Sequence, residues 1–324
     1  MLNRSQELEL TVLLTVVSGK DAVRENLSAL IPQLDFEKSE VIVPYDKFSS
    51  DIAELKVDFP QVFFHYIKDL GLAASPDVSA HAHRLYDRRR AVGLKLSRGR
   101  LIAMLEDHGR AADDWVENIE AAHLQDYSVI GGAIRNDVDK PLNWALYYCD
   151  FGRYAPPFEP REVSYVSDIN LAYKRADLMA VEDIWEDAFH ETAVHGALLA
   201  RGKKLFRDDR PVVHQRRNGL ELIPVLRERI SWGRIFAETR ASEFTFWKRC
   251  AFAAGSIFLP PLMLTRVFSH MRRQGQSVGR MLKITPVLTL ILIAWAFGEF
   301  LGYVCGEPSA SMIVSQPARS GVSS

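Results

Sequence analysis

The residues best suited to chemistry stand at the end of one apolar run. Leu101 to Leu105 has the composition of a buried strand, and Glu106, Asp107 and His108 follow it directly. In α/β folds, ligands bind at the carboxyl ends of strands, and carboxylates and imidazoles are groups that coordinate metal ions. The triplet therefore predicts a site for metal or phosphate chemistry at this strand end. The alternative interpretation is a solvated turn that closes an ordinary strand.

The elements that would position this site alternate along the first two thirds of the chain. Short apolar runs are separated by stretches with helical periodicity, which is typical of an α/β domain with a mostly parallel sheet. We expect Pro44 to end the second strand and Gly202 to cap the last helix. The expected strands are residues 10–17, 41–43, 62–64, 101–105 and 127–130, and the expected helices are residues 21–34, 85–96, 115–123 and 187–201.

Composition excludes several classes of protein. The chain of 324 residues has a formal net charge of -1, so the protein as a whole is not a general binder of nucleic acid or other polyanions. Its three cysteines, Cys149, Cys250 and Cys305, are far apart, which argues against a disulfide framework or a zinc ribbon. Residues 1–10 lack the apolar core of a secretory signal.

Charge is unevenly distributed along the chain. Between Gln215 and Lys283, 13 Lys or Arg stand against 4 acids. A basic excess beside apolar segments indicates anionic lipid more than nucleic acid. Residues 220–248 combine arginines with aromatic side chains, as helices on a membrane surface do, although ordinary packed helices are the alternative.

Two apolar segments follow. Residues 251–265 are interrupted by Pro260 and Pro261, whereas residues 284–304 are about long enough to span a bilayer, although they contain Glu299. If both crossed, the basic loop between them would lie outside, against the positive-inside rule. We therefore expect an interfacial or re-entrant first segment and at most one span. The expected organisation is an α/β domain (1–215), interfacial helices (216–249), membrane-associated helices (250–305) and a disordered tail rich in Ser and Pro (306–324).

Taken in order, the elements between residues 10 and 214 resemble family 2 glycosyltransferases with the GT-A fold. A strand that ends in two acids in this family is matched here by residues 40–46, with Asp46 on the second acid and Tyr45 in place of the first. Residues 89–93 match an A-R-N-x-G pattern, with Arg90 as its arginine. The E-D-H triplet takes the place of the D-x-D metal motif and resembles a bacterial subset of the family.

The resemblance implies a role for each matched position. Glu106 and His108, completed by His214, would hold a divalent ion, Mg²⁺ or Mn²⁺. Glu191 would be the general base that accepts the proton of the acceptor hydroxyl. The donor, a nucleotide sugar, would be contacted by Asp46, Asp107, Arg90, Arg216 and Arg217.

For several of these residues, an ordinary structural role or another candidate residue remains the alternative. His214 could be a core histidine, and Arg90 could belong to a solvated helix face. Glu186 or Asp187 could be the base in place of Glu191.

The family's activity is transfer of a sugar, here with inversion at the anomeric carbon. The C-terminal helices favour a lipid-linked or glycan acceptor in polysaccharide or glycolipid synthesis, with membrane lipids as partners. The expected location is the cytosolic face of a bacterial inner membrane. A non-catalytic scaffold subunit of a polysaccharide assembly complex is the alternative, favoured by the departures from the family pattern at Tyr45, Ala91 and His108.

Overall fold

The computed structural model describes residues 8–71, 78–241 and 244–305, and the expected tail from residue 306 lies outside this part of the chain. The described residues form two compact units. The first contains residues 8–135 and 156–216, and the second contains residues 136–155 and 217–305. Residues 136–155 therefore pack with the C-terminal helices, although the sequence analysis grouped them with residues 1–215.

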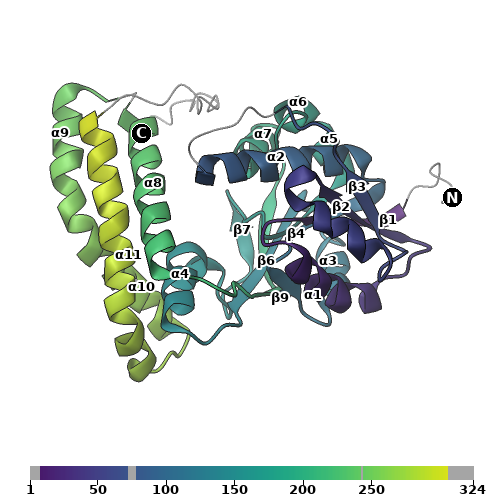
Figure 1. The fold of residues 1–324 in the computed structure, drawn as a ribbon, viewed down its shortest axis with the longest axis horizontal. Coiled ribbons are helices and arrows are strands. Elements are labelled where there is room, and N and C mark those ends of the chain that lie inside the picture. The colour runs from purple at the N-terminus through teal and green to yellow at the C-terminus, as the bar shows by residue number, and fades with distance from the viewer. Residues whose placement is uncertain (1–7, 72–77, 242–243, 306–324) are drawn as a thin grey trace. The chain divides into compact units, whose positions relative to one another are not determined.

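A mixed β-sheet forms the centre of the first unit (Figure 1). Its parallel half has the order β3-β2-β1-β4, and β4 then pairs with β8 in the antiparallel direction. The path continues through β6 and β9 to β5, and β7 pairs with β9. The α/β class is thus confirmed, and the parallel pairing is concentrated in the first half of the sheet. The strands are β1 (Leu8–Thr15), β2 (Ser39–Tyr45), β3 (Phe63–Tyr66), β4 (Gly99–Glu106), β5 (Gly109–Ala111), β6 (Val129–Asn136), β7 (Arg161–Val163), β8 (Asn170–Lys174) and β9 (Leu205–Gln215).

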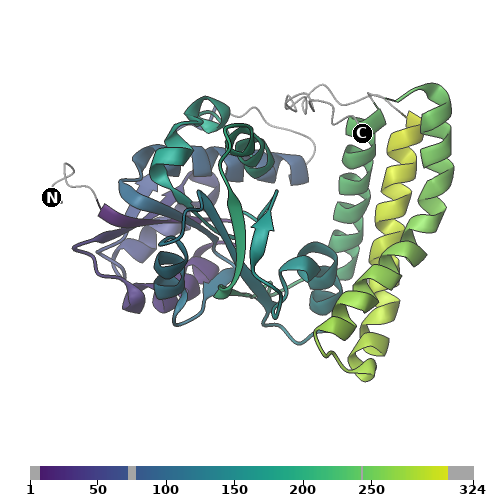
Figure 2. The same ribbon diagram turned by 180° about the vertical axis from the view of Figure 1, so that it is seen from behind.

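Helices cover both faces of this sheet, which is why its central strands are apolar throughout. In β1, Leu10, Val12 and Leu14 face one core, whereas Leu13 faces the other. Figures 1 and 2 show α1 and α3 on one face and α2, α5, α6 and α7 on the opposite face. The bounds are α1 (Lys20–Leu30), η1 (Ile31–Gln33), η2 (Lys47–Lys56), α2 (Val78–Leu96), α3 (Trp115–Ala122), α5 (Arg175–Met179), α6 (Glu182–Trp185) and α7 (Glu191–Ala200).

Three expected boundaries are wrong for local physical reasons. Pro44 does not end β2, which continues to Tyr45. Proline has no N–H group to donate, and it is tolerated here because the pairing with β1 extends only to Ile42, so that Pro44 is paired only with His65 of β3. The strand expected to stop before Gly131 continues as β6. A Cβ at Gly131 would lie 2.4 Å from the Val166 Cβ, so glycine permits this close approach. The last helix starts at Glu191, not near residue 187.

The second unit is helical. Its elements are α4 (Pro141–Phe151), η3 (Gly152–Tyr154), α8 (Leu222–Ala241), α9 (Phe246–Gly255), η4 (Ser256–Phe258), α10 (Leu259–Arg273) and α11 (Val278–Cys305). Pro260 and Pro261 do not interrupt the helical path, because they occupy the first turn of α10, where helix N–H groups need no intrahelical acceptor. By length and composition, Phe246–Arg273 and Val278–Cys305 could each cross a membrane.

Glycines bring α8 and α11 together. Cβ atoms placed on Gly233, Gly298 and Gly302 would lie 2.3, 2.2 and 2.4 Å from carbonyl oxygens of the facing helix. Small residues at such positions let two helix backbones approach closely. Glu299 on the same stretch of α11 is buried, and its Oε1 accepts a hydrogen bond from Trp295 Nε1 at 2.6 Å. Glu299, an acid that is costly to place in lipid, is therefore hydrogen-bonded within the protein.

Substitution of Gly298 by Ala should destabilise the second unit by about 1–3 kcal/mol, because the added methyl group would overlap the Ile230 carbonyl oxygen. Thermal unfolding of the purified protein measures the effect. Gly255→Ala is the matched control, since a Cβ there meets nothing within 4 Å. Equal melting temperatures for the two variants would contradict close packing at Gly298.

Candidate functional site

The candidate site lies at the carboxyl ends of β1 and β4. From β1 the chain continues through α1 to β2 on one side, whereas β4 lies on the other side of β1. Such a reversal of strand order leaves a crevice at the carboxyl ends of the two strands, where α/β proteins bind ligands. The segments that follow β1 and β4, residues 16–19 and 106–108, meet at this point.

Asp107 holds these two segments together. Its buried carboxylate accepts hydrogen bonds from the backbone N–H groups of Val17 (2.9 Å), Ser18 (2.8 Å) and Gly19 (3.0 Å). Gly19 has φ of 109°, a conformation that favours glycine, and it precedes the first turn of α1. Backbone N–H groups before a helix can bind a phosphate, but here those of Val17, Ser18 and Gly19 are hydrogen-bonded to Asp107. Asp107, predicted to contact the donor, has a structural role here.

Arg90 is the centre of a buried cluster of acids. Its Nη2 lies 2.6 Å from Glu106 Oε1, and its Nη1 lies 2.7 Å from Asp168 Oδ2 and 3.5 Å from Asp87 Oδ1. These partners come from β4, from the segment before β8 and from α2 itself. The guanidinium is therefore not part of a solvated helix face, and it joins three parts of the first unit in one ionic network.

Glu191, the predicted general base, belongs to the same cluster. It begins α7, and its Oε1 accepts a hydrogen bond from the Tyr165 hydroxyl at 2.8 Å. Its charge also acts on the titration of Arg90 and Asp168. The preceding His190 lies 3.2 Å from Asp87, which raises the pKa of this imidazole. The charge of Glu191 thus acts on Arg90 and Asp168, and its role as the general base stays a prediction.

Two members of the cluster were missed as site residues. Burial raises the pKa of Asp168 to about 8, and the charges of Glu191, Glu106 and Asp87 act in the same direction, against Arg90. Asp168 was visible in the sequence as the acid before Ile169, but no local pattern links it to a site. Asp87 stands three residues before Arg90, a helical spacing that places both on one face and could have indicated the pair.

Two of the predicted metal ligands, Glu106 and His108, lie in direct contact, and the role of Glu106, His108 and His214 as ligands stays a prediction. Glu106 Oε1 binds Arg90, and Glu106 Oε2 lies 3.0 Å from His108 Nε2. His214 is half-buried in β9, where it is paired with Arg110 of β5. No group of three His, Cys, Asp or Glu in the described ranges could hold a metal ion. One oxygen of Glu106 is thus occupied by Arg90, so a metal ion at Glu106 would bind beside this ion pair.

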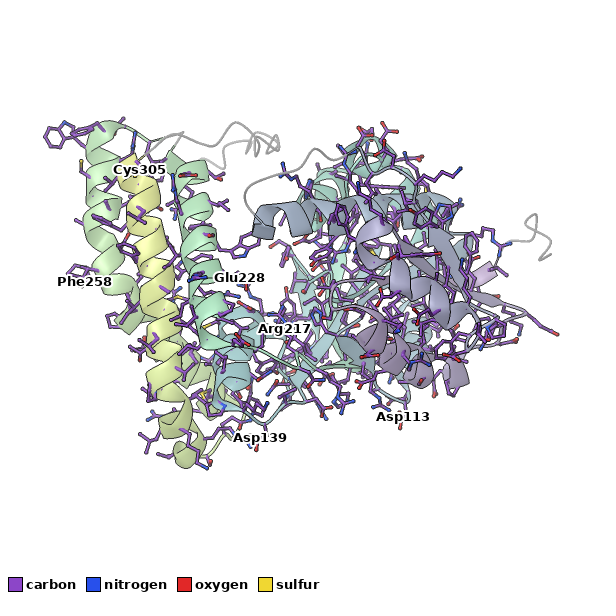
Figure 3. All side chains as sticks on the ribbon, viewed as in Figure 1. Asp113, Asp139, Arg217, Glu228, Phe258 and Cys305 are labelled. Carbon is purple, nitrogen blue, oxygen red and sulfur yellow. The ribbon has the colours of Figure 1, made fainter. Side chains whose placement is uncertain are left out.

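The remaining residues assigned to the donor also have partners in the protein. Asp46 is buried, accepts the Phe48 N–H at 2.7 Å, and pairs with Arg89 Nε at 2.8 Å. Arg216 is half-exposed and lies 3.2 Å from Glu25. Arg217, labelled in Figure 3, belongs to the second unit and lies 3.8 Å from Asp150.

Comparison with known proteins gives one solved structure to report. No known protein family and no curated protein matches the chain. The structure is similar to a mannosyltransferase from Pyrobaculum calidifontis that was solved in complex with GDP-Man and Mn²⁺. The two chains are 13% identical, the similarity covers 91% of this chain and 88% of that chain, and the TM-score is 0.49.

Replacement of Asp107 by Asn should destabilise the first unit by about 2 kcal/mol, because three backbone N–H groups lose a charged acceptor. Denaturant unfolding measures the change. The control Asp113→Asn removes an exposed carboxylate, labelled in Figure 3, whose ion pair with Arg110 spans 3.5 Å. It should change stability by less than about 0.5 kcal/mol. A loss of the same size in both variants would refute the role of Asp107.

The raised pKa of Asp168 predicts a specific dependence of stability on pH. Between the ordinary value of 3.8 and about 8, the folded protein keeps a proton that the unfolded chain has released. The contribution of Asp168 to stability therefore decreases as pH rises through this window. Asp168→Asn carries no such proton, so its melting temperature should fall less steeply with pH than that of the parent protein. The exposed Asp126→Asn should retain the parent slope, and an unchanged slope in Asp168→Asn would contradict the assignment.

Proposed function

We propose that this protein is a membrane-associated glycosyltransferase with a catalytic α/β domain of the GT-A type. It would transfer a sugar with inversion from a nucleotide-sugar donor to a lipid-linked acceptor, in polysaccharide or glycolipid synthesis at the cytosolic face of a bacterial inner membrane. The observation that carries the proposal is the network in which Arg90 joins Glu106 and Asp168 beside Glu191. Three of these residues, Arg90, Glu106 and Glu191, stand at positions that resemble the motifs of family 2 glycosyltransferases.

Glu191 suits the role of general base. In an inverting transfer, the acceptor oxygen attacks the anomeric carbon as a carboxylate takes its proton, and the nucleoside diphosphate leaves from the opposite face. The Tyr165 hydroxyl binds one carboxylate oxygen of Glu191 at 2.8 Å and so fixes its orientation. Glu191 is half-buried at the start of α7, and its carboxylate would receive the proton of the acceptor hydroxyl.

Arg90 acts in this proposal as a positioning residue. Arg90 is buried, and its guanidinium is bound to Glu106 and Asp168. In this proposal it holds these two side chains in place and does not bind the donor phosphates. Asp46, which is paired with Arg89, would contact the base or ribose of the nucleotide.

The surface of α9, η4 and α11 supports membrane association. Large apolar side chains on these helices are exposed, and Phe258, labelled in Figure 3, points away from α8 and α11. An exposed apolar surface of this extent marks an interaction site. The set comprises Phe246, Trp247, Phe252, Ile257, Phe258, Leu282, Leu290, Ile293, Phe297, Phe300 and Val304.

The packing of α8 favours helices that lie in the interface over a hairpin that crosses the bilayer. Ile230 and Arg234 of α8 face Gly298 and Gly302 of α11, so the two helices run in the same direction. A crossing α11 would carry the half-exposed Arg234 into the hydrocarbon layer, and a charge there costs about 2.5–3.5 kcal/mol. This agrees with the expectation of at most one span.

Glu191→Gln should lower the transfer rate by about 10²–10⁴, the contribution of a well-placed general base, and leave donor binding unchanged. Transfer from UDP-, GDP-, TDP- and CMP-sugars measures the rate. Thermal shift with the same nucleotides, with and without Mn²⁺ or Mg²⁺, measures binding. The exposed Glu186→Gln is the control for loss of a nearby acid.

The two readouts separate the possible outcomes. Near-normal transfer by Glu191→Gln, together with a loss in Glu186→Gln, would move the base to Glu186. Folded protein that binds none of the nucleotides would favour the non-catalytic scaffold subunit.

A further inference from the structure

A cavity of about 370 Å³ lies at the start of α11, within the second unit. It is separate from the acid cluster described above, and neither its residues nor its chemistry takes part in the proposed transfer. Its wall combines the first turns of α11 with the start of α4. The lining residues are Asp139, Pro141, Trp144, Ser277, Gly279, Arg280, Lys283 and Ile284.

The charges of this cavity suit an anion. Arg280 stacks on the Trp144 ring at 4.5 Å and is held by Gln276 at 2.7 Å, so its guanidinium has a fixed place in the wall. Lys283 adds a second, exposed cation one turn later. Asp139, the one acid in the lining, accepts the Trp144 Nε1–H at 2.7 Å and lies 3.9 Å from Arg280. Two cations thus face a single carboxylate that is already hydrogen-bonded.

The backbone at this position adds to the attraction. Ser277 precedes α11, and its Oγ accepts the Arg280 N–H at 3.2 Å. The N–H groups of the first helical turn otherwise have no intrahelical acceptor, and the helix dipole favours negative charge at this end. The cavity therefore combines a helix N-terminus with two basic side chains and an aromatic wall.

The surroundings of the cavity indicate that its anion is part of a lipid. Val278 and Leu282 lie between the lining residues along α11, and both side chains are 69% exposed. From residue 259 to residue 283 the chain has five Lys or Arg and no acid. The apolar surface of α9, η4 and α11 continues from here along the helices. A soluble anion would make no use of these exposed apolar side chains, whereas a lipid would cover them with its acyl chains.

We propose that this cavity binds the phosphate headgroup of an anionic membrane lipid. Arg280 and Lys283 would bind the phosphate oxygens through charge-assisted hydrogen bonds, with Trp144 beside the headgroup. The acyl chains would lie along the exposed face of α11. This inference rests on the proposed membrane association, but it is independent of the transferase chemistry.

Flotation of the full-length protein with lipid vesicles tests the proposal. Vesicles of phosphatidylcholine with phosphatidic acid present a terminal phosphate, and vesicles with phosphatidylserine at matched surface charge serve for comparison. The double variant Arg280→Gln/Lys283→Gln should lose binding to phosphatidic acid vesicles about tenfold more than the control Arg272→Gln/Arg273→Gln. Both doubles remove two cations from α10 or α11, and the control arginines lie outside the cavity.

Each outcome decides for or against the proposal. Equal losses in both double variants would show a non-specific basic surface and overturn it. Displacement of the parent protein by inorganic phosphate equimolar with the lipid phosphate would indicate a site for a free anion. Lys283→Gln alone, at an exposed side chain, should show part of the loss without any change in fold measured by circular dichroism. Glu191→Gln should float like the parent protein, so a failure of the transferase proposal would not be mistaken for a failure of this one.

Discussion

A single guanidinium, that of Arg90, sets the arrangement of the candidate site. A charge as deeply buried as this one needs acidic partners, and here the Glu106 side chain lies 2.6 Å away and the Asp168 side chain 2.7 Å away. Because Glu106 ends β4 and Asp168 precedes β8, the two acids also fix where the parallel half of the sheet meets its antiparallel half. Removal of Arg90 would leave mutually repelling acids without a counter-ion, and the site and the sheet junction would be lost together.

A second carboxylate, that of Asp107, acts beside this network on the backbone. It binds three successive amides at the β1–α1 turn and so closes the place where many α/β proteins hold a phosphate. The neighbouring residues in the E-D-H triplet thus have different tasks. Glu106 joins the ionic network, Asp107 holds a loop, and His108 packs between them, 3.0 Å from the Glu106 carboxylate.

Much of the fold could be predicted from the sequence, because periodicity reports burial directly. The strands that contain Leu10, Val41 and Leu101 and the helices around Leu27 and Trp115 are present close to the expected places. The short strands β5 and β7 could not be found, because three residues carry no periodic signal.

Only some residues of the candidate site could be proposed from the sequence. Glu106 was proposed because it follows a clear apolar strand, and Glu191 because of its place in the family resemblance. The partners of Arg90 could not be found, since contact between α2 and Asp168 depends on tertiary structure. The same limit applies to the metal prediction, in which the spacing of Glu106, His108 and His214 could not reveal that an arginine binds one oxygen of Glu106.

Residues 136–155 belong to the second unit, although segments of the first unit precede and follow them in the sequence. This has a consequence for how the chain folds during synthesis. α4 leaves the ribosome before β7 to β9, but its partners in the second unit, α8 and α11, are made only later. Leu146 and Tyr147 of α4, buried in the finished protein, are therefore exposed while the sheet is being completed. A fragment that ends at Arg216 would retain this uncovered helix permanently. The sheet is complete by that residue, but such a fragment would expose apolar side chains that the second unit covers in the whole protein.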